Sequence, residues 1–480
     1  MSLLVMLALP LAAAVGSWIG GRRVAPQLTI ASSLVVFALA LRIVPYTASG
    51  NVVVAIADFV AADALSALIV LLVALVGVTA AIYSWGYMAR SSVHAPERLR
   101  VYYANYNLFL FSMLAIPMVV EPTLVWIFVE LTTLASAMLV SFENTHAALE
   151  AAWKYVALSL MGAAIALLGF LLLFAAMQAG GGGAYTWTGL REAAAHMPPV
   201  LLQTAFLLIL VGFGTKVGLV PLHTWLPDAH SQAPSPVCAL LSGIETTSVL
   251  YVVLRLLPVL NAASIANLAT WPVVFGLISV GTAAFLLLQV RDYKRLFAYS
   301  TVEHMGIILV AAGLASPDAH YGAMYQIVSH TATKSFCFFA AGAAVLAVTT
   351  RDIASVRGLI RTSPIAAASL LLGGLAIAGA PPLAVFLSEF SIFRAGLAEG
   401  RYAVVALLVV FIAIGFIGVM LHINRMVFGQ PQEAASPAAA LPRSCVAILT
   451  LAGALVIALG LYLPRPLHDL LQQASGALHG

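Results

Sequence analysis

Apolar runs of about 20 residues recur from one end of the chain to the other, separated by short polar segments. A run of this length crosses the hydrocarbon core of a bilayer as an α-helix. The pattern predicts an all-α polytopic membrane protein, and an even number of spans places both termini on one side. We count about fourteen runs, centred near residues 11, 37, 75, 112, 132, 165, 210, 247, 280, 307, 336, 376, 412 and 452.

Basic residues divide unevenly between the two sets of loops that alternate along the chain. In membrane proteins the side richer in Lys and Arg faces the cytoplasm. We therefore expect a multi-pass membrane protein with the richer set in the cytoplasm and both termini on the outer side. The richer set is Arg22, Arg23, Arg90, Arg98, Arg100, Lys154, Arg291, Lys294, Arg295, Arg351, Arg357, Arg361, Arg425 and Arg443; the poorer set is Arg42, Arg191, Arg255, Arg394, Arg401 and Arg465.

Composition narrows the class of protein further. Of 480 residues, 62% are hydrophobic and only 8% are charged, which excludes an ordinary soluble protein. The net charge of +4 follows from the cytoplasmic loops and requires no nucleic-acid partner. Cys238, Cys337 and Cys445 lack the spacing of a metal, haem or iron–sulfur site. We expect no redox centre, metal or other cofactor in this chain.

Two of the four lysines lie inside predicted spans, whereas the eighteen arginines map to loops or helix ends. Lysine is costly in hydrocarbon, but a desolvated lysine can lose its proton near neutral pH, which arginine does not do. This segregation makes Lys216 and Lys334 candidate proton carriers.

Carboxylates and histidines extend the set of ionisable residues inside the spans. His330 precedes Lys334 by four residues, so both lie on one face of a helix. The histidines have an alternative role as hydrogen-bonding packing residues, and Glu245 has an alternative position at the membrane interface. The predicted proton relay is Glu130, Lys216, Glu245, His304, His330, Lys334 and Glu389.

Glycines and prolines interrupt the seventh run around Lys216 and the twelfth run before Glu389. Paired broken helices are typical of transporter sites. The two runs lie five spans apart and cross the membrane in opposite directions, which predicts inverted repeats of helices 4–8 and 9–13. The predicted division is a three-helix segment (1–104), two half-channels (105–260 and 261–430) and helix 14 (431–480). The breaking residues are Gly212, Gly214, Gly218 and Pro221, then Gly373, Gly374, Gly379, Pro381 and Pro382.

The stretch "HTWLPDAH" follows the first break and contains His223, Asp228 and His230. These residue types also bind metals, but their spacing matches no strong metal site. We expect them to line a cytoplasmic site of proton uptake.

The chain resembles the antiporter-like subunits of respiratory complex I, Mrp Na+/H+ antiporters and group 4 membrane-bound hydrogenases over nearly its whole length. Five stretches carry this resemblance. They are "VWIFVELTTL", "GFGTKVGLVPLHTWLPDAHSQAPSPVCALLSG", "RDYKRLFAYSTVEHMG", "SHTATKSFCFF" and "GAPPLAVFLSEF". "STVEHMG" is most similar to the hydrogenase-4 or formate-hydrogenlyase branch, whereas a glutamate on helix 12 resembles the M-type subunit of complex I.

The resemblance implies fourteen helices, two inverted five-helix units and a Glu–Lys pair formed by Glu130 and Lys216. It implies Lys334 and His330 as the central relay and Glu389 as the terminal group. Relatives carry a lysine or another polar group on helix 8, for which Glu245, Thr246 or Thr247 would substitute here. The chain also ends soon after helix 14, unlike the L-type subunit.

The leading hypothesis from this resemblance is a proton-translocating subunit of a complex I-type respiratory complex, with no redox chemistry in this chain. It implies a multi-pass protein of the bacterial inner membrane with both termini on the periplasmic side. Iron–sulfur, NiFe or flavin centres and quinone would belong to partner subunits. The alternative is a subunit of an Mrp D-type Na+/H+ antiporter. A single-chain solute transporter is disfavoured because the ionisable residues form a row over several helices, and a structural anchor leaves buried charges unexplained.

Overall fold

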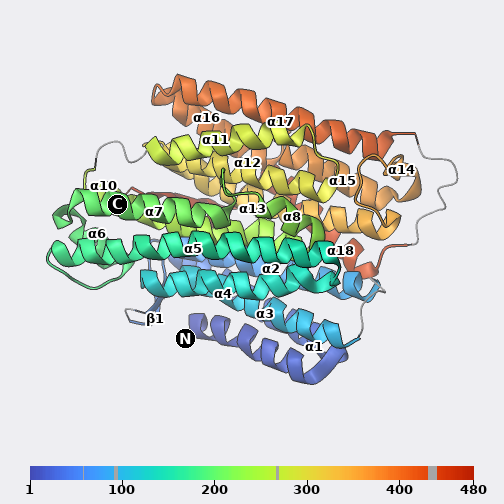
Figure 1. Cartoon of the computed structure of the whole chain (residues 1–480), viewed down its shortest axis with the longest axis horizontal. Coiled ribbons are helices and arrows are strands. Elements are labelled where there is room, and N and C mark those ends of the chain that lie inside the picture. Colours follow the sequence, from blue (N-terminus) through green and yellow to red (C-terminus); the bar gives the residue numbers. More distant parts are fainter. Residues whose placement is uncertain (58, 91–95, 266–269, 431–439, 480) are drawn as a thin grey trace.

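A computed structural model describes residues 1–57, 59–90, 96–265, 270–430 and 440–479. Its long helices run roughly parallel in one elongated bundle (Figure 1). The helices are α1 (Ser2–Ala48), α2 (Ala64–Arg90), α3 (Pro96–Met118), α4 (Pro122–Val140), η1 (Ser141–Glu143), α5 (His146–Ala179), α6 (Trp187–Ala193), η2 (Ala194–His196), α7 (Pro199–Val217), α8 (Trp225–Gln232), α9 (Ser235–Leu240), η3 (Leu241–Glu245), α10 (Thr246–Ala262), α11 (Thr270–Leu287), α12 (Tyr293–Gly313), α13 (Pro317–Val348), α14 (Leu359–Thr362), α15 (Pro364–Ile377), α16 (Ala384–Ala398), α17 (Tyr402–Phe428), α18 (Arg443–Leu461) and α19 (Arg465–Gly476).

The predicted all-helical membrane fold is confirmed. Within the described residues, twelve helical segments are long and apolar enough to cross a bilayer. Helix α1 supplies two of them because its backbone turns at Gly21, where φ is 71°. Helix α3 and the shorter apolar helix α15 occupy two more predicted runs, so each of the fourteen predicted centres lies in a helix. The described part of the chain departs from the all-α prediction only in a small antiparallel hairpin, formed by β1 (Val53–Ile56) and β2 (Val60–Ala62).

Both predicted helix breaks are present. Helix α7 ends at Val217 and Gly218 takes a left-handed conformation with φ of 88°, after which α8 resumes at Trp225. Helix α15 ends at Ile377, Gly379 has φ of 76°, and α16 begins at Ala384. Each break leaves helix carbonyls without their usual partners, so side chains or neighbouring backbone must satisfy them.

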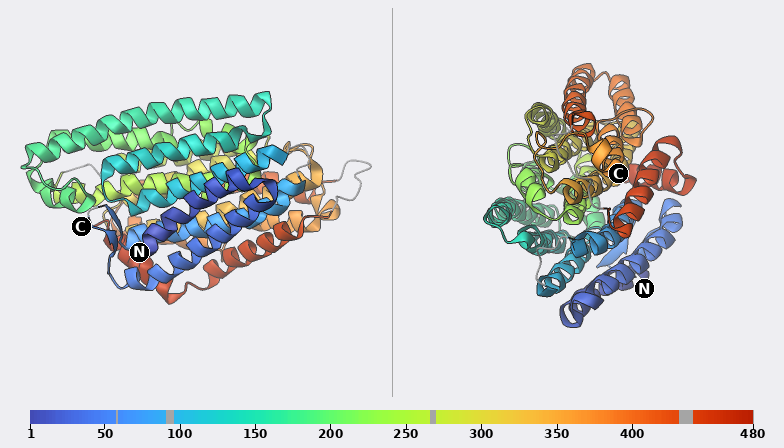
Figure 2. Two further views of the ribbon diagram at one scale, coloured as in Figure 1. Left: turned by 90° about the horizontal axis from the view of Figure 1, so that it is seen from below. Right: turned by 90° about the vertical axis from the view of Figure 1, so that its right-hand side faces the viewer.

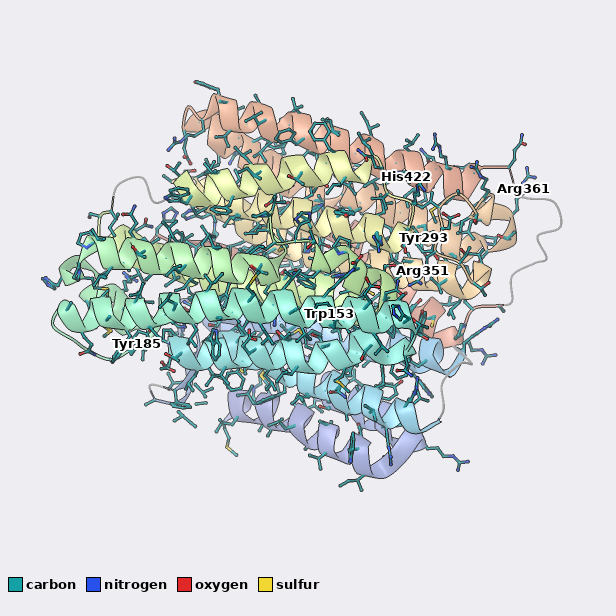
Figure 3. All side chains as sticks on the ribbon, in the orientation of Figure 1. Trp153, Tyr185, Tyr293, Arg351, Arg361 and His422 are labelled. Atoms are coloured by element: carbon teal, nitrogen blue, oxygen red, sulfur yellow. The ribbon has the colours of Figure 1, made fainter. Side chains whose placement is uncertain are left out.

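The two ends of the bundle differ in charge. Both chain termini and the hairpin lie at one end, as the even count of spans predicts (Figure 1). Arg351 and Arg361 lie at the opposite end, far from Tyr185 (Figure 3). We call this opposite end, where α2 finishes with Arg90 and α17 finishes just after Arg425, the arginine-rich end.

The helices that carry the predicted relay follow one another across the bundle. Figure 2 shows the N-terminal helices at one edge in the end-on view and α16 with α17 at the other. Helices α4, α7, α13 and α12 lie between these edges (Figure 1). The predicted boundaries at residues 104 and 105 and at residues 260 and 261 fall inside α3 and α10, respectively. The boundary after residue 430 follows α17, and residues 431–439 lie outside the described residues. The division into two half-channels stays a prediction.

Candidate functional site

Lys216 is almost completely buried, with 2% of its surface exposed, and lies in the last turn of α7. Its Nζ donates to the carbonyl O of Val129 at 2.6 Å and to Oγ1 of Thr133, both on α4. The third neighbour is Oε1 of Glu245, at 3.5 Å. An ammonium has three protons, and three acceptors including one carboxylate surround it, so the site accommodates the charged lysine.

Glu245 is fully buried and stands in the middle of its membrane span. Its Oε1 accepts hydrogen bonds from Oγ1 of Thr132 and from the hydroxyl of Tyr155, each at 2.9 Å. Its burial within this candidate span favours a position inside the membrane over the alternative position at the interface. Glu245 ends η3, a π-helical turn that separates α9 from α10, and such turns often mark functional sites.

Glu130 does not form the pair with Lys216 that the family resemblance implied. Both of its buried carboxylate oxygens lack a hydrogen-bond partner, and within the described residues it makes no ion pair. The carboxylate that contacts Lys216 is that of Glu245. Glu130 is still on α4, one residue after the Val129 carbonyl that accepts from Lys216, so it belongs to the same cluster.

The π turn joins the Lys216 cluster to α13. The carbonyl O of Ser242 lies 3.1 Å from Nε2 of His330, and the carbonyl O of Gly243 accepts from Oγ1 of Thr331 at 2.8 Å. The hydroxyls of Ser242 and Thr301 are 2.6 Å apart. A π turn leaves carbonyls without α-helical partners. Here α13 satisfies two of them, so one short segment contacts both halves of the predicted relay.

Lys334 is fully buried on α13 and has a different environment from Lys216. Its Nζ donates to the carbonyl O of Phe297 at 2.7 Å and to Oγ of Ser300, both on α12. No carboxylate of the described residues lies within ion-pair distance. Two neutral acceptors match the two N–H groups of an uncharged amine. The two buried lysines thus have sites of different hydrogen-bonding capacity.

His304 stands between α13 and the second helix break. Its ring centroid is 5.3 Å from that of His330. Its Nε2 lies 3.0 Å from the carbonyl O of Ile377, the last residue of α15. At the first break, Nε1 of Trp225 donates to the carbonyl O of Thr215 at 2.8 Å. A side-chain donor therefore caps the freed backbone at both breaks.

Two buried carboxylates lie at the far end of the relay. Glu389, on α16, is 4% exposed and packs against the second break, since a Cβ on Gly379 would lie 2.6 Å from its Oε2. Glu303, on α12, is 5% exposed and packs against Gly415 of α17, where a Cβ would lie 2.2 Å from its Oε1. The absent side chains at these two glycines provide the space for the carboxylates.

The three residues predicted to take up protons differ in their exposure to solvent. Asp228 is partly exposed and pairs with Nη2 of Arg295 at 2.6 Å and Nζ of Lys154 at 3.5 Å. His230 is fully buried, and its Nδ1 lies 2.7 Å from the carbonyl O of Leu226. His223 is 8% exposed and lies in the turn after the first break. Asp228 is the member that solvent reaches.

The structure adds residues that the sequence did not single out. Tyr155 and Thr132 bind Glu245, and Gln326 with Ser388 lies beside His304. Glu303 directly precedes His304 in "STVEHMG" but was not among the predicted relay residues. Lys294, expected in a loop, is buried and donates to the carbonyl oxygens of Ser231 and Ala233. Among the residues near Glu245 and His304, only Glu303 could have been recognised from the sequence, because a carboxylate is rare inside a membrane span. Hydroxyl and amide side chains are common in membrane helices and do not indicate a site by themselves.

Nothing in the described part of the chain is arranged as a metal site. No group of three or more His, Cys, Asp or Glu side chains in that part could hold a metal ion, and the three cysteines are buried free thiols. The arrangement that the structure presents is a row of buried ionisable side chains on helices from α4 to α16.

Known proteins match this chain over most of its length. Residues 121–415 match the family described as "NADH:quinone oxidoreductase/Mrp antiporter, TM", and residues 58–95 match "NADH-Ubiquinone oxidoreductase (complex I), chain 5 N-terminus". The hydrogenase-4 component F homolog of Methylacidiphilum infernorum is 37% identical over 430 residues, which cover 87% of this chain and 88% of the relative.

Solved structures share the fold. A chain of the membrane-bound sulfane sulfur reductase, an archaeal respiratory membrane complex, has a TM-score of 0.88 at 23% identity and covers 99% of this chain and 97% of its own. A chain of the Mrp complex from Dietzia sp. has a TM-score of 0.89 at 21% identity, over 100% and 97%. Together with the matched residues, these relations show that the chain belongs to the NADH:quinone oxidoreductase/Mrp antiporter family of membrane subunits.

Proposed function

We propose that this chain is a proton-translocating subunit of a complex I-type respiratory complex, related to NADH:quinone oxidoreductase or to group 4 membrane-bound hydrogenases. The observation that carries the proposal is the Lys216–Glu245 ion pair, which is buried beside a broken membrane helix. A charge held there is costly, so an ionisable pair at this depth favours a role in moving protons over a purely structural role. Iron–sulfur, NiFe or flavin centres and quinone would lie in partner subunits.

The proposed cycle starts with a change in the contacts of Lys216. When Glu245 is near, the carboxylate stabilises the ammonium; when a conformational change separates them, the uncompensated charge favours proton release. Glu130 has no partner of its own among the described residues and offers a second carboxylate to Lys216. Exchange between the two carboxylates would alter the tendency of Lys216 to hold its proton.

The released proton would continue through α13 to the second break. The π turn contacts His330 directly, and Lys334 follows on the same helical face. Glu389 would be the terminal group of this path, next to the turn between α15 and α16. Uptake would occur at Asp228, His223 and His230, with solvent reaching Asp228 first.

An Mrp-type Na+/H+ antiporter subunit is the second candidate, because a chain of the Mrp complex has the same fold. It would use the same residues but exchange sodium for protons. Sodium-dependent proton movement in vesicles would favour this alternative, whereas co-purification with iron–sulfur or NiFe subunits would favour the respiratory complex.

The Glu389→Gln variant of the intact complex is expected to release protons about tenfold more slowly in proteoliposomes, because an amide cannot take up and pass on a proton. The Lys216 cluster should be unaffected. A pH-sensitive dye on the release side gives the rate. Glu399→Gln is a matched control, since Glu399 lies outside the relay and accepts from the backbone N–H groups of Ala315 and Ser316. Unchanged release in Glu389→Gln would remove α16 from the path.

The proposed orientation places the arginine-rich end in the cytoplasm. A reporter inserted near Ser355 should therefore report the cytoplasm, and a reporter fused behind the last residue should report the periplasm. Paired alkaline phosphatase and fluorescent protein fusions measure this. A cytoplasmic C-terminus would contradict the orientation.

A further inference from the structure

The hydrogen bonds of His304 define its protonation state. Nδ1 lies 2.8 Å from Nε2 of Gln326, and Nε2 lies 3.0 Å from the carbonyl O of Ile377. The amide nitrogen only donates and the carbonyl only accepts. In this arrangement, the ring carries its one proton on Nε2, accepts at Nδ1 and is neutral.

Gln326 is itself held by a second partner. It is fully buried on α13, and its Oε1 accepts from the hydroxyl of Ser388 on α16. Ser388 has a further acceptor within reach, because its Oγ lies 2.9 Å from the carbonyl O of Val385. The amide therefore bridges His304 and Ser388, the residue that precedes Glu389.

We propose that Gln326 is a positioning residue that turns its amide over when His304 gains a proton. After the turn, Oε1 of Gln326 would accept from Nδ1–H of the imidazolium, and Nε2 would donate to Oγ of Ser388. The Ser388 hydroxyl would then donate to the carbonyl of Val385. Buried polar groups are costly when they lose their partners, and here both arrangements leave every one of these groups paired.

This inference rests on the proposed function, because it assigns His304 a loaded and an unloaded state within the relay. The transfer moves one proton: as the Gln326 amide turns and frees the Nδ1 lone pair of His304, the Nδ1–H bond of a His330 imidazolium breaks and a bond forms at Nδ1 of His304. The ring centroids are 5.3 Å apart, and Nδ1 of His330 has no protein partner in the described part of the chain. Other ionisable groups in this region are Lys334 on α13, Glu389 on α16 and Glu303 on α12.

A fixed amide would have a different consequence. If Gln326 only packed the helices, its Nε2 would keep facing Nδ1, and a proton on that nitrogen would meet another donor. His304 would then stay neutral and could only cap α15. The orientation of one side chain therefore separates a proton carrier from a structural histidine.

The test is a titration of His304 in the full-length protein, labelled with ¹⁵N-histidine in bilayers and followed by solid-state NMR; His304→Gln assigns its signals. The wild type should show the neutral Nε2–H form, which converts to imidazolium as the pH falls. Gln326→Leu removes the acceptor, so its midpoint should move to lower pH. Gln326→Glu supplies a permanent acceptor, so its midpoint should move to higher pH. We expect each shift to be about one pH unit.

Gln203→Leu on α7 is the matched control and should leave the midpoint unchanged. Shifts in one common direction, no shifts, or an Nδ1–H form in the wild type would overturn the inference. If Gln326→Leu fails to fold, Gln326→Met removes the same acceptor with an unbranched side chain of similar length, and its midpoint should also move to lower pH. Proton translocation is measured separately in the same bilayers. Its absence in the wild type would refute the proposed function, while the titration would still decide the role of Gln326.

Discussion

The Lys216→Arg variant is expected to assemble normally but to translocate protons at less than about a tenth of the wild-type rate. Arginine keeps the positive charge and the ability to pair with Glu245, but its pKa exceeds about 12. Lowering that value by about 5 units would cost about 7 kcal/mol, at about 1.36 kcal/mol per unit. A proton carrier must cycle between charged and neutral forms, whereas a structural cation needs only its charge. Initial rates in proteoliposomes, normalised to subunit content, measure the effect.

Two comparisons separate lost proton exchange from a simple misfit of the guanidinium group. Lys216→Met removes the charge and should be as slow as Lys216→Arg. Lys294→Arg introduces the same bulk at another buried lysine, which donates to the backbone carbonyls of Ser231 and Ala233 and lies outside the relay, and it should translocate normally. Wild-type rate and stoichiometry in Lys216→Arg would show that Lys216 does not carry the proton.

The sequence was informative wherever a residue type conflicted with its surroundings. A lysine among apolar residues predicted the buried Lys216, because charge in hydrocarbon is rare without a purpose. Glycine and proline clusters predicted both helix breaks, which lie at Gly218 and Gly379. These signals are local, so no knowledge of neighbouring helices was required.

The partner of each group could not be predicted in the same way. Glu130 and Glu245 are both acidic, and which one contacts Lys216 depends on the rotation and bending of their helices. The π turn at Leu241–Glu245 helps to set that rotation, and the sequence "LSGIE" has no distinctive composition. Gln326 carries no charge, so its place beside His304 follows only from how α12 and α13 pack.

The Glu245→Gln variant is expected to slow translocation by about tenfold or more, whereas Glu130→Gln should slow it by only a few-fold. Glu245 is the carboxylate at 3.5 Å from Lys216, and loss of one partner of a buried ion pair leaves the other uncompensated. Lys216 can respond by losing its proton, so assembly should survive while the cycle stops in one state. Glu130 has no ion pair in the described part of the chain, and its loss removes only the alternative carboxylate.

The comparison of these two variants tests the pairing directly. Glu121→Gln is the control on α4, because Glu121 accepts from the backbone N–H groups of Thr123 and Leu124 at the helix start, outside the relay. It should keep the wild-type rate. Translocation and complex content are measured for all three variants in parallel. A larger loss in Glu130→Gln than in Glu245→Gln would mean that Glu130 is the working counter-charge of Lys216. In that case, the contact with Glu245 would be a resting arrangement that turnover does not require.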